Sequence, residues 1–365
     1  MVVTKWQGLQ AFQRLVVLLL VVLLPSSALQ AAARSSLYQA EVSAEQTQQQ
    51  WQREALQQVL IRVTGQPDIM QQPQLRSELA NAASYVKQFE AVRTDHGNSV
   101  RVLLDAQRIQ QLLRQQQIPI WGGQRPELLF WIVEQQGAER QFVRQSDSVW
   151  LQSLQEALTA QALPYTLPLY DIDDLLNLTE TDVWAGFWQQ IEQASSRYRV
   201  HQIVVLLLEA AGNTEAGGWK LTALRQHDGN ILRDELEATS EQQLMQQYAD
   251  RLSQQLAQQY AILLTPNMQQ QAVLQINGLK SLADVVTLER RFSELLGVSR
   301  VQIVRHAPAE TLFGLTLQMS EEQLLQSLVF EPNLTRRPAA DPWSSDYATA
   351  TTPQTVLAEF DYSKP

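Results

Sequence analysis

Two uninterrupted apolar runs constrain the fold of this chain more than any other feature. They are residues 128–133 (LLFWIV) and residues 203–208 (IVVLLL). A strand with one face in water alternates apolar and polar residues, whereas a strand covered on both faces is apolar throughout. We therefore expect a central sheet with helices on both faces.

The segments around these runs predict an α/β domain over residues 126–265, with the order β-α-β-α-β-β-β-α and parallel strands in its first half. A stripe of Val183, Trp184, Phe187, Trp188 and Ile191 predicts one amphipathic helix between the two runs. A capping box at residues 240–243 begins the last helix, which continues to residue 260.

A shorter β-α-β-β-α pattern stands on each side of this domain, over residues 34–121 and 270–336. In the first, residues 94–98 (TDHGN) form a hairpin turn, and Asp105 caps the helix that follows. In the second, Gly297 ends a helix and Ser320 with Gln323 forms a capping box. This order is that of a ferredoxin-like split βαβ unit. We therefore expect an α+β / α/β chain of three small mixed domains.

The two ends of the chain have the composition of segments outside a folded core. Lys5 and Arg14 precede the apolar run of residues 15–24, and small residues follow. This pattern predicts a signal peptide over residues 1–33, cleaved after Ala28 or Ala33. An uncleaved inner-membrane anchor is the alternative, although the run is short for a span. Residues 337–365 are rich in Pro, Ser and Thr, and we expect a disordered tail there.

Composition and motifs exclude several classes of function. A net charge of -10 and a pI near 5.0 argue against nucleic-acid binding, which needs a basic surface. The absence of cysteine excludes thiol catalysis, disulfides and iron–sulfur clusters. We find no phosphate-binding loop, nucleophile elbow or zinc-protease helix. We therefore expect no cofactor and no enzymatic activity, while a catalytic triad scattered along the sequence stays open.

One cluster of acidic residues is the candidate interaction site. Asp171, Asp173 and Asp174 follow a predicted strand, and ligands of α/β sheets bind in such loops. Three carboxylates can hold a cation such as Ca²⁺, but the loop lacks the glycine and the distal glutamate of a calcium loop. A helix N-cap or a solvated loop explains the cluster better. Trp184 joins the candidate site as an aromatic ring suited to a glycan, although the buried stripe of a helix explains its spacing from Trp188 better.

Several short motifs carry a resemblance to a known family. They are the opening segments 37–42 (LYQAEV) and 59–65 (VLIRVTG), the PIW of residues 119–121 before Arg125 and Pro126, and residues 167–171 (LPLYD) ahead of the DVW of residues 182–184. With them the chain resembles the family catalogued as domain of unknown function 2066, over about residues 37–330. More remotely, the first two domains resemble flagellar assembly protein T, and the middle domain resembles the N-terminal domain of TolB. The resemblance implies an exported proteobacterial protein that works as a scaffold or adaptor without catalytic activity.

These observations lead to one main hypothesis and two alternatives. We expect a periplasmic, non-enzymatic protein that contacts an envelope protein partner during assembly or maintenance of the cell envelope. The mature chain carries no segment that could span the membrane. The first alternative is a binding module for a cell-wall glycan or lipid fragment at the acidic loop. The second is an envelope hydrolase whose site is scattered in the sequence.

Overall fold

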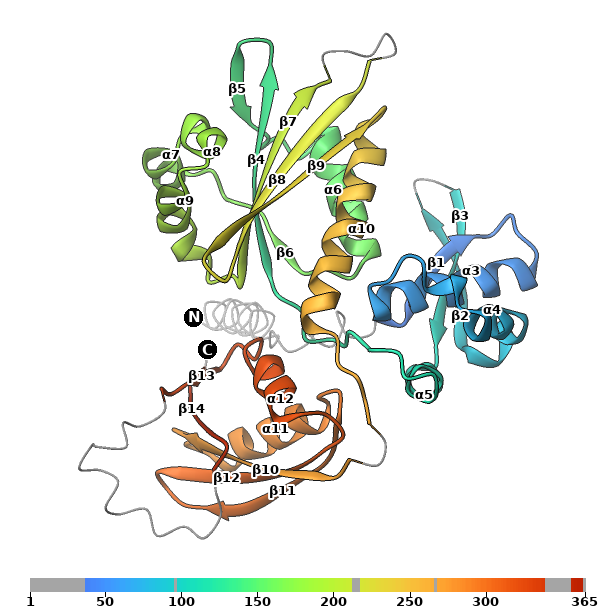
Figure 1. The fold of residues 1–365 in the computed structure, drawn as a ribbon, viewed down its shortest axis with the longest axis vertical. Coiled ribbons are helices and arrows are strands. Elements are labelled where there is room, and N and C mark those ends of the chain that lie inside the picture. Colours follow the sequence, from blue (N-terminus) through green and yellow to red (C-terminus); the bar gives the residue numbers. More distant parts are fainter. Residues whose placement is uncertain (1–36, 95–96, 212–216, 266–267, 339–355, 364–365) are drawn as a thin grey trace, which may run out of the picture.

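The computed structural model describes residues 37–94, 97–211, 217–265, 268–338 and 356–363 (Figure 1). Within these residues the protein is a mixed α+β fold with three sheets, which confirms the general class expected from the sequence. We call the parts that carry the sheets the N-terminal unit (residues 37–121), the middle unit (residues 122–262) and the C-terminal unit (residues 263–338 and 356–363). The predicted signal peptide lies outside the described residues.

The N-terminal unit is a three-stranded antiparallel sheet in the order β1-β3-β2, packed against helices. Its elements are β1 (Gln39–Ser43), α3 (Gln48–Thr64), α4 (Pro73–Glu78), β2 (Val86–Thr94), β3 (Gly97–Leu104) and α5 (Ala106–Gln115). Two short 3₁₀ segments lie beside α4, at Ile69–Gln71 and Leu79–Tyr85. The Asp105 carboxylate accepts hydrogen bonds from the backbone N–H groups of Gln107 and Arg108, so it caps α5 as the sequence predicts.

The middle unit is a six-stranded sheet with helices on both faces (Figure 1). The strands run in the order β5-β4-β7-β8-β9, with β6 also paired to β4. The strands are β4 (Leu128–Gln136), β5 (Glu139–Phe142), β6 (Tyr165–Thr166), β7 (Gln202–Ala210), β8 (Trp219–His227) and β9 (Asn230–Ala238). The helices are α6 (Val149–Ala160), α7 (Ile172–Asn177), α8 (Glu180–Ala185), α9 (Trp188–Ser195) and α10 (Glu241–Tyr260).

Burial explains why two of these strands are apolar throughout. Successive residues of β4 point to opposite faces of the sheet, so Phe130 and its neighbour Trp131 belong to two different hydrophobic clusters. One cluster lies under α6 and α10 and the other under α8 and α9. β4 pairs parallel with β7, and both are central strands of the sheet, as the two apolar runs predict.

The prediction of one long helix through Trp184 and Trp188 is wrong. The chain forms α8 and α9 instead, because Gly186 adopts a left-handed conformation with φ of 70° and ends α8. The two tryptophans therefore lie on different helices. Strand β5 is not predicted from the sequence either. All its residues except Phe142 are exposed, so it shows no hydrophobic pattern.

The C-terminal unit is a five-stranded sheet in the order β11-β12-β10-β14-β13. Its elements are β10 (Gln270–Asn277), α11 (Leu282–Ser293), β11 (Val298–His306), β12 (Glu310–Leu317), α12 (Glu321–Leu328), β13 (Leu334–Arg336) and β14 (Ala358–Tyr362).

The prediction of a disordered tail from residue 337 is wrong for β14. This strand pairs parallel with β10 and antiparallel with β13, and it buries Ala358 and Phe360. The average composition of the tail does not reveal residues 358–362, a short segment of alternating apolar and polar residues. This segment forms a strand because β10 and β13 offer backbone partners on both sides. The tail residues 339–355 and 364–365 lie outside the described part.

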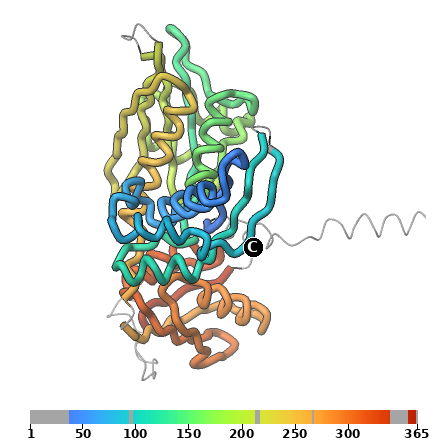
Figure 2. Tube along the Cα trace, turned by 90° about the vertical axis from the view of Figure 1, so that its right-hand side faces the viewer, coloured from blue at the N-terminus to red at the C-terminus, as the bar shows by residue number. Residues whose placement is uncertain are grey.

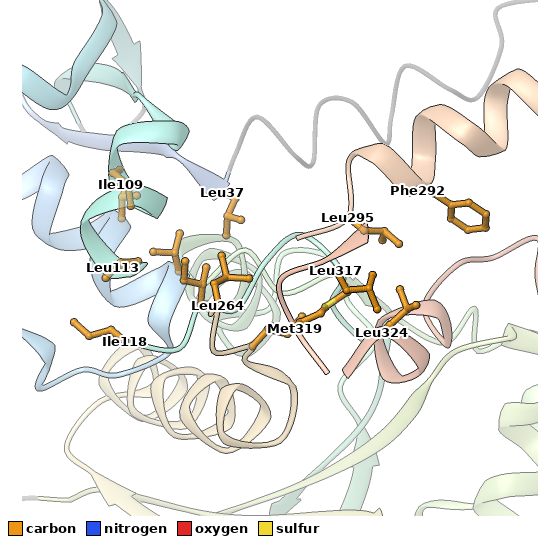
Figure 3. Close-up of a cluster of buried hydrophobic side chains, with 14 of the residues drawn as sticks. Leu37, Ile109, Leu113, Ile118, Leu264, Phe292, Leu295, Leu317, Met319 and Leu324 are labelled. Atoms are coloured by element: carbon orange, nitrogen blue, oxygen red, sulfur yellow. The ribbon is translucent and has the colours of Figure 1, made fainter. Parts of the chain in front are cut away.

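The three units meet where the two connecting segments cross. Ile120 and Ile262 exchange both backbone hydrogen bonds at 2.9 Å, so the two connections form a small antiparallel bridge. One hydrophobic cluster joins the N-terminal and C-terminal units through residues such as Ile118, Leu264 and Met319 (Figure 3). The view turned by 90° shows the N-terminal unit beside the middle unit and the C-terminal unit below them (Figure 2).

Among the described helices, none combines the length and the hydropathy that crossing a membrane requires.

Candidate functional site

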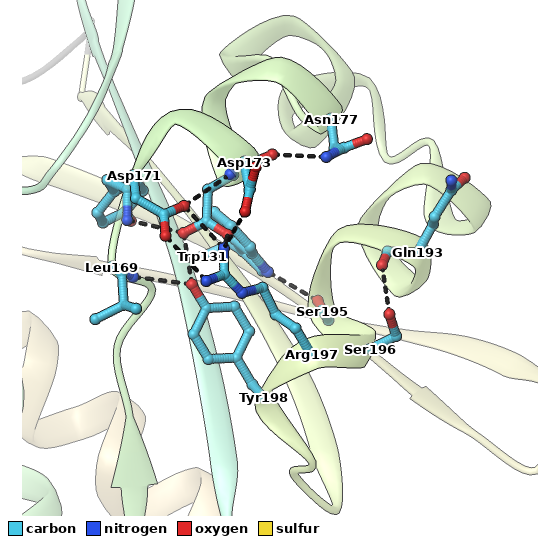
Figure 4. A network of polar contacts seen from close by, with 12 residues as sticks. Trp131, Leu169, Asp171, Asp173, Asn177, Gln193, Ser195, Ser196, Arg197 and Tyr198 are labelled. Carbon is cyan, nitrogen blue, oxygen red and sulfur yellow. Dashed lines mark hydrogen bonds and ion pairs between the residues drawn. The ribbon is translucent and has the colours of Figure 1, made fainter.

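The acidic candidate residues lie at the start of α7, where they form a closed polar network (Figure 4). Asp171 is the N-cap of α7 and accepts a hydrogen bond from the backbone N–H of Asp174 at 3.0 Å. Arg197 donates to both carboxylate oxygens of Asp171, at 2.8 and 2.9 Å. This paired contact holds the pKa of Asp171 below its ordinary value, chiefly through the hydrogen bond from Arg197.

Asp174 is the buried centre of the same network, with only 1% of its surface exposed. Its carboxylate accepts hydrogen bonds from the Tyr198 hydroxyl and from the backbone N–H of Tyr170, and one oxygen lies 3.3 Å from the Arg197 guanidinium. Burial, and then the bond to Asp174, raise the pKa of Tyr198 to about 12. The network therefore fixes α7 to the segment that follows α9.

These contacts decide what the acidic residues do chemically. The oxygens of Asp171 and Asp174 are already occupied by an arginine, a hydroxyl and backbone N–H groups. Only Asp173 is strongly exposed, with 78% of its side chain in solvent, and it lies 3.9 Å from Arg197. Within the described ranges, no three His, Cys, Asp or Glu side chains are grouped as a metal site would need. The cluster acts as an N-cap and anchor of α7.

Trp184 lies on α8, where its ring is half-buried against the hydrophobic cluster below α8 and α9. The guanidinium of Arg140 on β5 covers the ring at 4.5 Å from its centre. This stacking covers one face of the ring, which a sugar would have to displace Arg140 to reach. Trp184 packs against the sheet and Arg140, whereas the Asp171 network anchors α7. The two therefore do not form one site, although both belong to the helices on this face of the sheet.

Exposed apolar side chains stand on α7 and on the segment that leads into it. Leu169, Ile172 and Leu176 are 69%, 76% and 78% exposed, and we call this set the α7 ridge. Leu175, at 39% exposed, lies beside them on α7. Monomeric proteins rarely gather such side chains in one place without a binding role. The spacing of residues 172, 175 and 176 places them on one helical face, but this pattern alone does not tell an exposed face from a buried one.

A hollow of about 200 Å³ adjoins the ridge. It is lined by residues that come from three segments: Val143, Arg144, Leu151, Leu167, Pro168, Leu169 and Tyr170. Leu169 therefore borders both the hollow and the ridge. Projecting apolar side chains beside a recess of mixed polar and apolar lining, which includes Arg144, resemble the knob and pocket of protein–protein contact sites.

A second candidate is an open cavity of about 390 Å³ where the three units meet. Its walls include Leu37 of the N-terminal unit, His201 of the middle unit and Phe330 of the C-terminal unit. The Phe330 ring contacts the rings of His201 and Tyr260 edge-on, at 5.2 and 5.0 Å between ring centres. Burial lowers the pKa of His201, against the charge of Glu127 and a hydrogen bond with the backbone of Val329, which raise it.

Two buried arginines hold this junction together. Arg62 of α3 donates to the carbonyl of Ala160, and Arg125 donates to the carbonyl of Gln161, both at 2.6 Å. These carbonyls end helix α6, where the helix dipole favours positive charge. Arg125 also donates to the carbonyl of Arg62 at 2.8 Å and lies over the Trp121 ring. Burial, and then the charge of the nearby Arg62, lower the pKa of Arg125 to about 9, so the guanidinium keeps its charge at neutral pH.

The comparisons with known proteins reach only the first part of the chain. Residues 31–122 match the model of a family described as a domain of unknown function (DUF8605). The match covers about a quarter of the sequence and falls on the N-terminal unit. It is a different family of unknown function from the one whose motifs the chain resembles. No curated protein and no solved structure matches the chain.

Proposed function

We propose that this chain is a non-enzymatic adaptor or assembly factor of the bacterial cell envelope, and that it docks an envelope protein on the α7 ridge. The observation that carries the proposal is the exposure of Leu169, Ile172 and Leu176, each at least 69% in solvent on one short helix and its entry segment. Exposed apolar side chains favour association, because burying each one against a partner contributes about 1.5–3 kcal/mol to the free energy of binding.

The network at the start of α7 supports a docking role because it makes the ridge rigid. Contacts of Arg197 and Tyr198 with Asp171 and Asp174 tie the N-terminal turn of α7 to the segment after α9. A preorganised surface loses little conformational entropy when a partner binds. A short helix without such anchors would fray, because one and a half turns are marginal in water.

The chemistry around the ridge indicates what kind of partner it takes. Asp173 stands exposed beside Ile172, and the first turn of α8 adds Glu180 and Asp182. We propose that the occupant is a helix or strand of an envelope protein with an apolar face flanked by Lys or Arg. The opposite charges would orient the partner and raise its association rate.

The location and the domain architecture form part of the same proposal. The basic residues, the apolar run and the small residues of residues 1–33 support export to the periplasm. The β-α-β-β-α order in the N-terminal and C-terminal units supports two ferredoxin-like domains, which flank a middle domain of the kind found at the N-terminus of TolB. Modular domains of this kind suit a scaffold that makes contacts on several sides.

The test compares which proteins are captured by the tagged chain in living cells of its native bacterium after crosslinking. The variant carries Ile172→Asp and Leu176→Asp, and the matched control carries Leu282→Asp on α11, where the side chain is 70% exposed. Surface changes of this kind alter the free energy of unfolding by about 0.5 kcal/mol or less. We expect one envelope protein with the wild type and the control, and its loss with the ridge variant.

Two results would overturn the proposal. One is capture of the same envelope protein by the ridge variant at the wild-type level. The other is a wild-type chain that crosslinks to no protein at all while it is correctly exported and folded.

A ligand-binding function is the second candidate, because the cavity at the junction has the size of a small-molecule site. It places the apolar Leu37 and Phe330 near the charged Arg291 and Glu331. Thermal unfolding in the presence of cell-wall glycan fragments and phospholipids tests this function. A stabilising ligand whose effect disappears in Arg291→Ala would favour it over docking at the ridge.

A further inference from the structure

Trp188, the first residue of α9, differs from the other tryptophans in the described part of the chain. Each of the others contacts an aromatic ring or an arginine: Trp184 lies under Arg140, for example, and Trp150 packs edge-on against Trp219. Within the same residues, no aromatic ring and no arginine lies over the half-buried ring of Trp188. One tryptophan is therefore left with a ring that a ligand can reach without displacing an arginine or another ring.

The orientation of this ring is fixed by hydrogen bonds of its indole nitrogen. The Trp188 Nε1–H group donates to Oε1 of Gln226 on β8 at 2.9 Å, and it lies 3.1 Å from Oε1 of Glu192, one helical turn further along α9. A side chain that is already held in one orientation loses little conformational entropy when a ligand binds to it.

The ring belongs to the wall of a hollow of about 290 Å³ between α9 and the strands β7 and β8, which we call the Trp188 hollow. Its wall extends from Trp188 to Ser195, the two ends of α9, and on to Arg199. An α-helix rises about 10 Å over this distance. The volume is near the lower limit for small-molecule sites, about 300 Å³, so the hollow suits a short ligand that lies along the helix.

The polar side chains around the hollow offer both donors and acceptors to such a ligand. Oε2 of Glu192 and the amide nitrogen of Gln226 take part in no hydrogen bond within the described ranges, and Arg199 forms no ion pair there. A hydroxyl group both donates and accepts, so it can bond to a carboxylate and to an amide N–H group. The hollow therefore combines an aromatic surface with partners for several hydroxyl groups and one anionic group.

The backbone of Arg199 is a separate observation that points to this wall. Arg199 adopts a left-handed conformation with φ of 51°. This conformation is unfavourable for a residue with a Cβ atom, and residues that adopt it are concentrated at binding and active sites. Here it is adopted by an arginine, although glycine or asparagine would fit the backbone better.

We propose that the Trp188 hollow binds a sugar unit that carries a carboxylate. The apolar face of the sugar ring stacks on Trp188, Glu192 and Gln226 bond to its hydroxyl groups, and Arg199 pairs with the carboxylate. A flat aromatic ligand would leave these polar side chains without partners, and a small anion would make no use of the ring. The site is separate from the α7 ridge, so glycan binding and protein docking are independent functions.

The test is calorimetric titration of the purified chain with two disaccharides. One is N-acetylglucosaminyl-N-acetylmuramic acid, which carries a carboxylate, and the other is diacetylchitobiose, which carries none. We expect the acidic disaccharide to bind with a dissociation constant below about 1 mM. It should bind about tenfold more tightly than the neutral one, because only the acidic disaccharide forms an ion pair with Arg199.

Four variants assign the binding to the hollow, with circular dichroism as the check that each is folded. Trp188→Leu should weaken the binding of both disaccharides about tenfold or more, and Trp188→Phe, which keeps a ring, should weaken it less. Arg199→Asn keeps a residue that accepts the left-handed backbone, and it should abolish the preference for the acidic disaccharide. Trp184→Leu is the matched control and should bind as the wild type does, because Arg140 covers that ring.

Three results would overturn the assignment. The first is a wild-type chain that binds neither disaccharide at about 10 mM. The second is equal affinity of the wild type for the two disaccharides. The third is binding that persists unchanged in Trp188→Leu or Trp188→Phe and in Arg199→Asn, which would place the ligand elsewhere on the chain.

Discussion

Neighbouring residues of the same type play different roles in this protein, and Asp173 and Asp174 show the contrast most clearly. Asp173 has 78% of its side chain in solvent, whereas Asp174 has 1% of its surface exposed and accepts hydrogen bonds from Tyr198 and Tyr170. Burial of a charged group is tolerated only when partners of this kind satisfy it.

We therefore predict unequal effects of the same substitution at the two positions. Asp174→Asn removes the charge opposite Arg197 and weakens a buried hydrogen-bonded network, and we expect a loss of about 3 kcal/mol in the free energy of unfolding. Asp173→Asn is the control, with an expected change of about 0.5 kcal/mol or less. Urea unfolding measures both. Equal effects at the two positions would show that the network does not anchor α7.

His201 gives a prediction of pH dependence. Burial lowers its pKa below the ordinary value of 6.5, so the unfolded chain binds a proton more readily than the folded chain does. This contribution to stability is complete above about pH 6.5 and is lost as the pH falls towards the lowered pKa of the folded state. In His201→Asn the amide oxygen can still accept the N–H of Glu127, which His201 accepts at Nδ1 in the wild type, but it cannot titrate.

The measurement is the free energy of unfolding of wild type and His201→Asn between pH 7.5 and pH 5. We expect the wild type to lose more stability than the variant across this range. The same comparison with His306→Asn, at the exposed end of β11, controls for general effects of removing a histidine. Parallel curves for wild type and His201→Asn would contradict the prediction.

At the residue scale, contacts between sequence neighbours can be predicted from the sequence, whereas contacts between distant segments cannot. A helix N-cap at the acidic cluster is one of the predicted alternatives, because an N-cap depends on its immediate neighbours, and Asp171 is that N-cap. Its partner Arg197 lies 26 positions away and could not be found, because only the folded α7–α9 arrangement brings the two together. The ridge was visible as an i, i+3, i+4 pattern, but exposure cannot be read from such a pattern alone.

At the scale of elements, glycines decide where helices end and how closely they pack. Gly65 ends α3 with a φ of 65°, and a Cβ atom there would lie 2.1 Å from the Cβ of Ala257 on α10. The N-terminal and middle units therefore approach each other through a site where a side chain has no room.

We predict that Gly65→Ala destabilises the protein by about 3 kcal/mol or more, through backbone strain and overpacking together. Gly229→Ala is the matched control, because Gly229 also has a positive φ of 77° but no atom within 4 Å of the added Cβ. It should cost about 1–2 kcal/mol from backbone strain alone. Similar losses for the two variants, measured by urea unfolding, would mean that α3 and α10 adapt to the added methyl group.

Elements with a strong period were predicted, and elements that depend on a distant surface were not. The buried strands β4 and β7 follow from their apolar runs, because both of their faces are covered. Strand β14 was missed because five residues within a Pro- and Thr-rich tail carry little signal until β10 and β13 are present. The break between α8 and α9 depends on the backbone of Gly186, which hydrophobic periodicity does not detect.

At the scale of the whole molecule, the three units are joined by polar groups as well as by a shared hydrophobic cluster. Arg125 donates hydrogen bonds to carbonyls of α3, of the α6 terminus and of its own connecting segment. The sequence includes this residue in one of the motifs behind the family resemblance, but its role at the junction cannot be predicted, because its partners come from three separate segments.

We predict that Arg125→Met lowers the free energy of unfolding by about 3 kcal/mol and splits the unfolding curve into separate steps, because the buried carbonyls lose their donor. Arg140→Met is the control: this arginine stacks on Trp184 and makes one long, exposed hydrogen bond to Gln135, both within the middle unit, and its loss should cost about 1 kcal/mol or less. Tryptophan fluorescence and circular dichroism, followed together in urea, distinguish one step from two. A single coincident transition in Arg125→Met would show that the units remain coupled without it.

The central claim is that the α7 ridge contacts an envelope protein, and a photo-crosslinking amino acid placed at the ridge tests it most directly. The crosslinker replaces Leu176 in one strain and Leu282 on α11 in another, since both side chains are largely exposed, and living cells are then irradiated. We expect one recurring adduct with an envelope protein at position 176 and none at position 282. No adduct at position 176, or the same adducts at both positions, would contradict it.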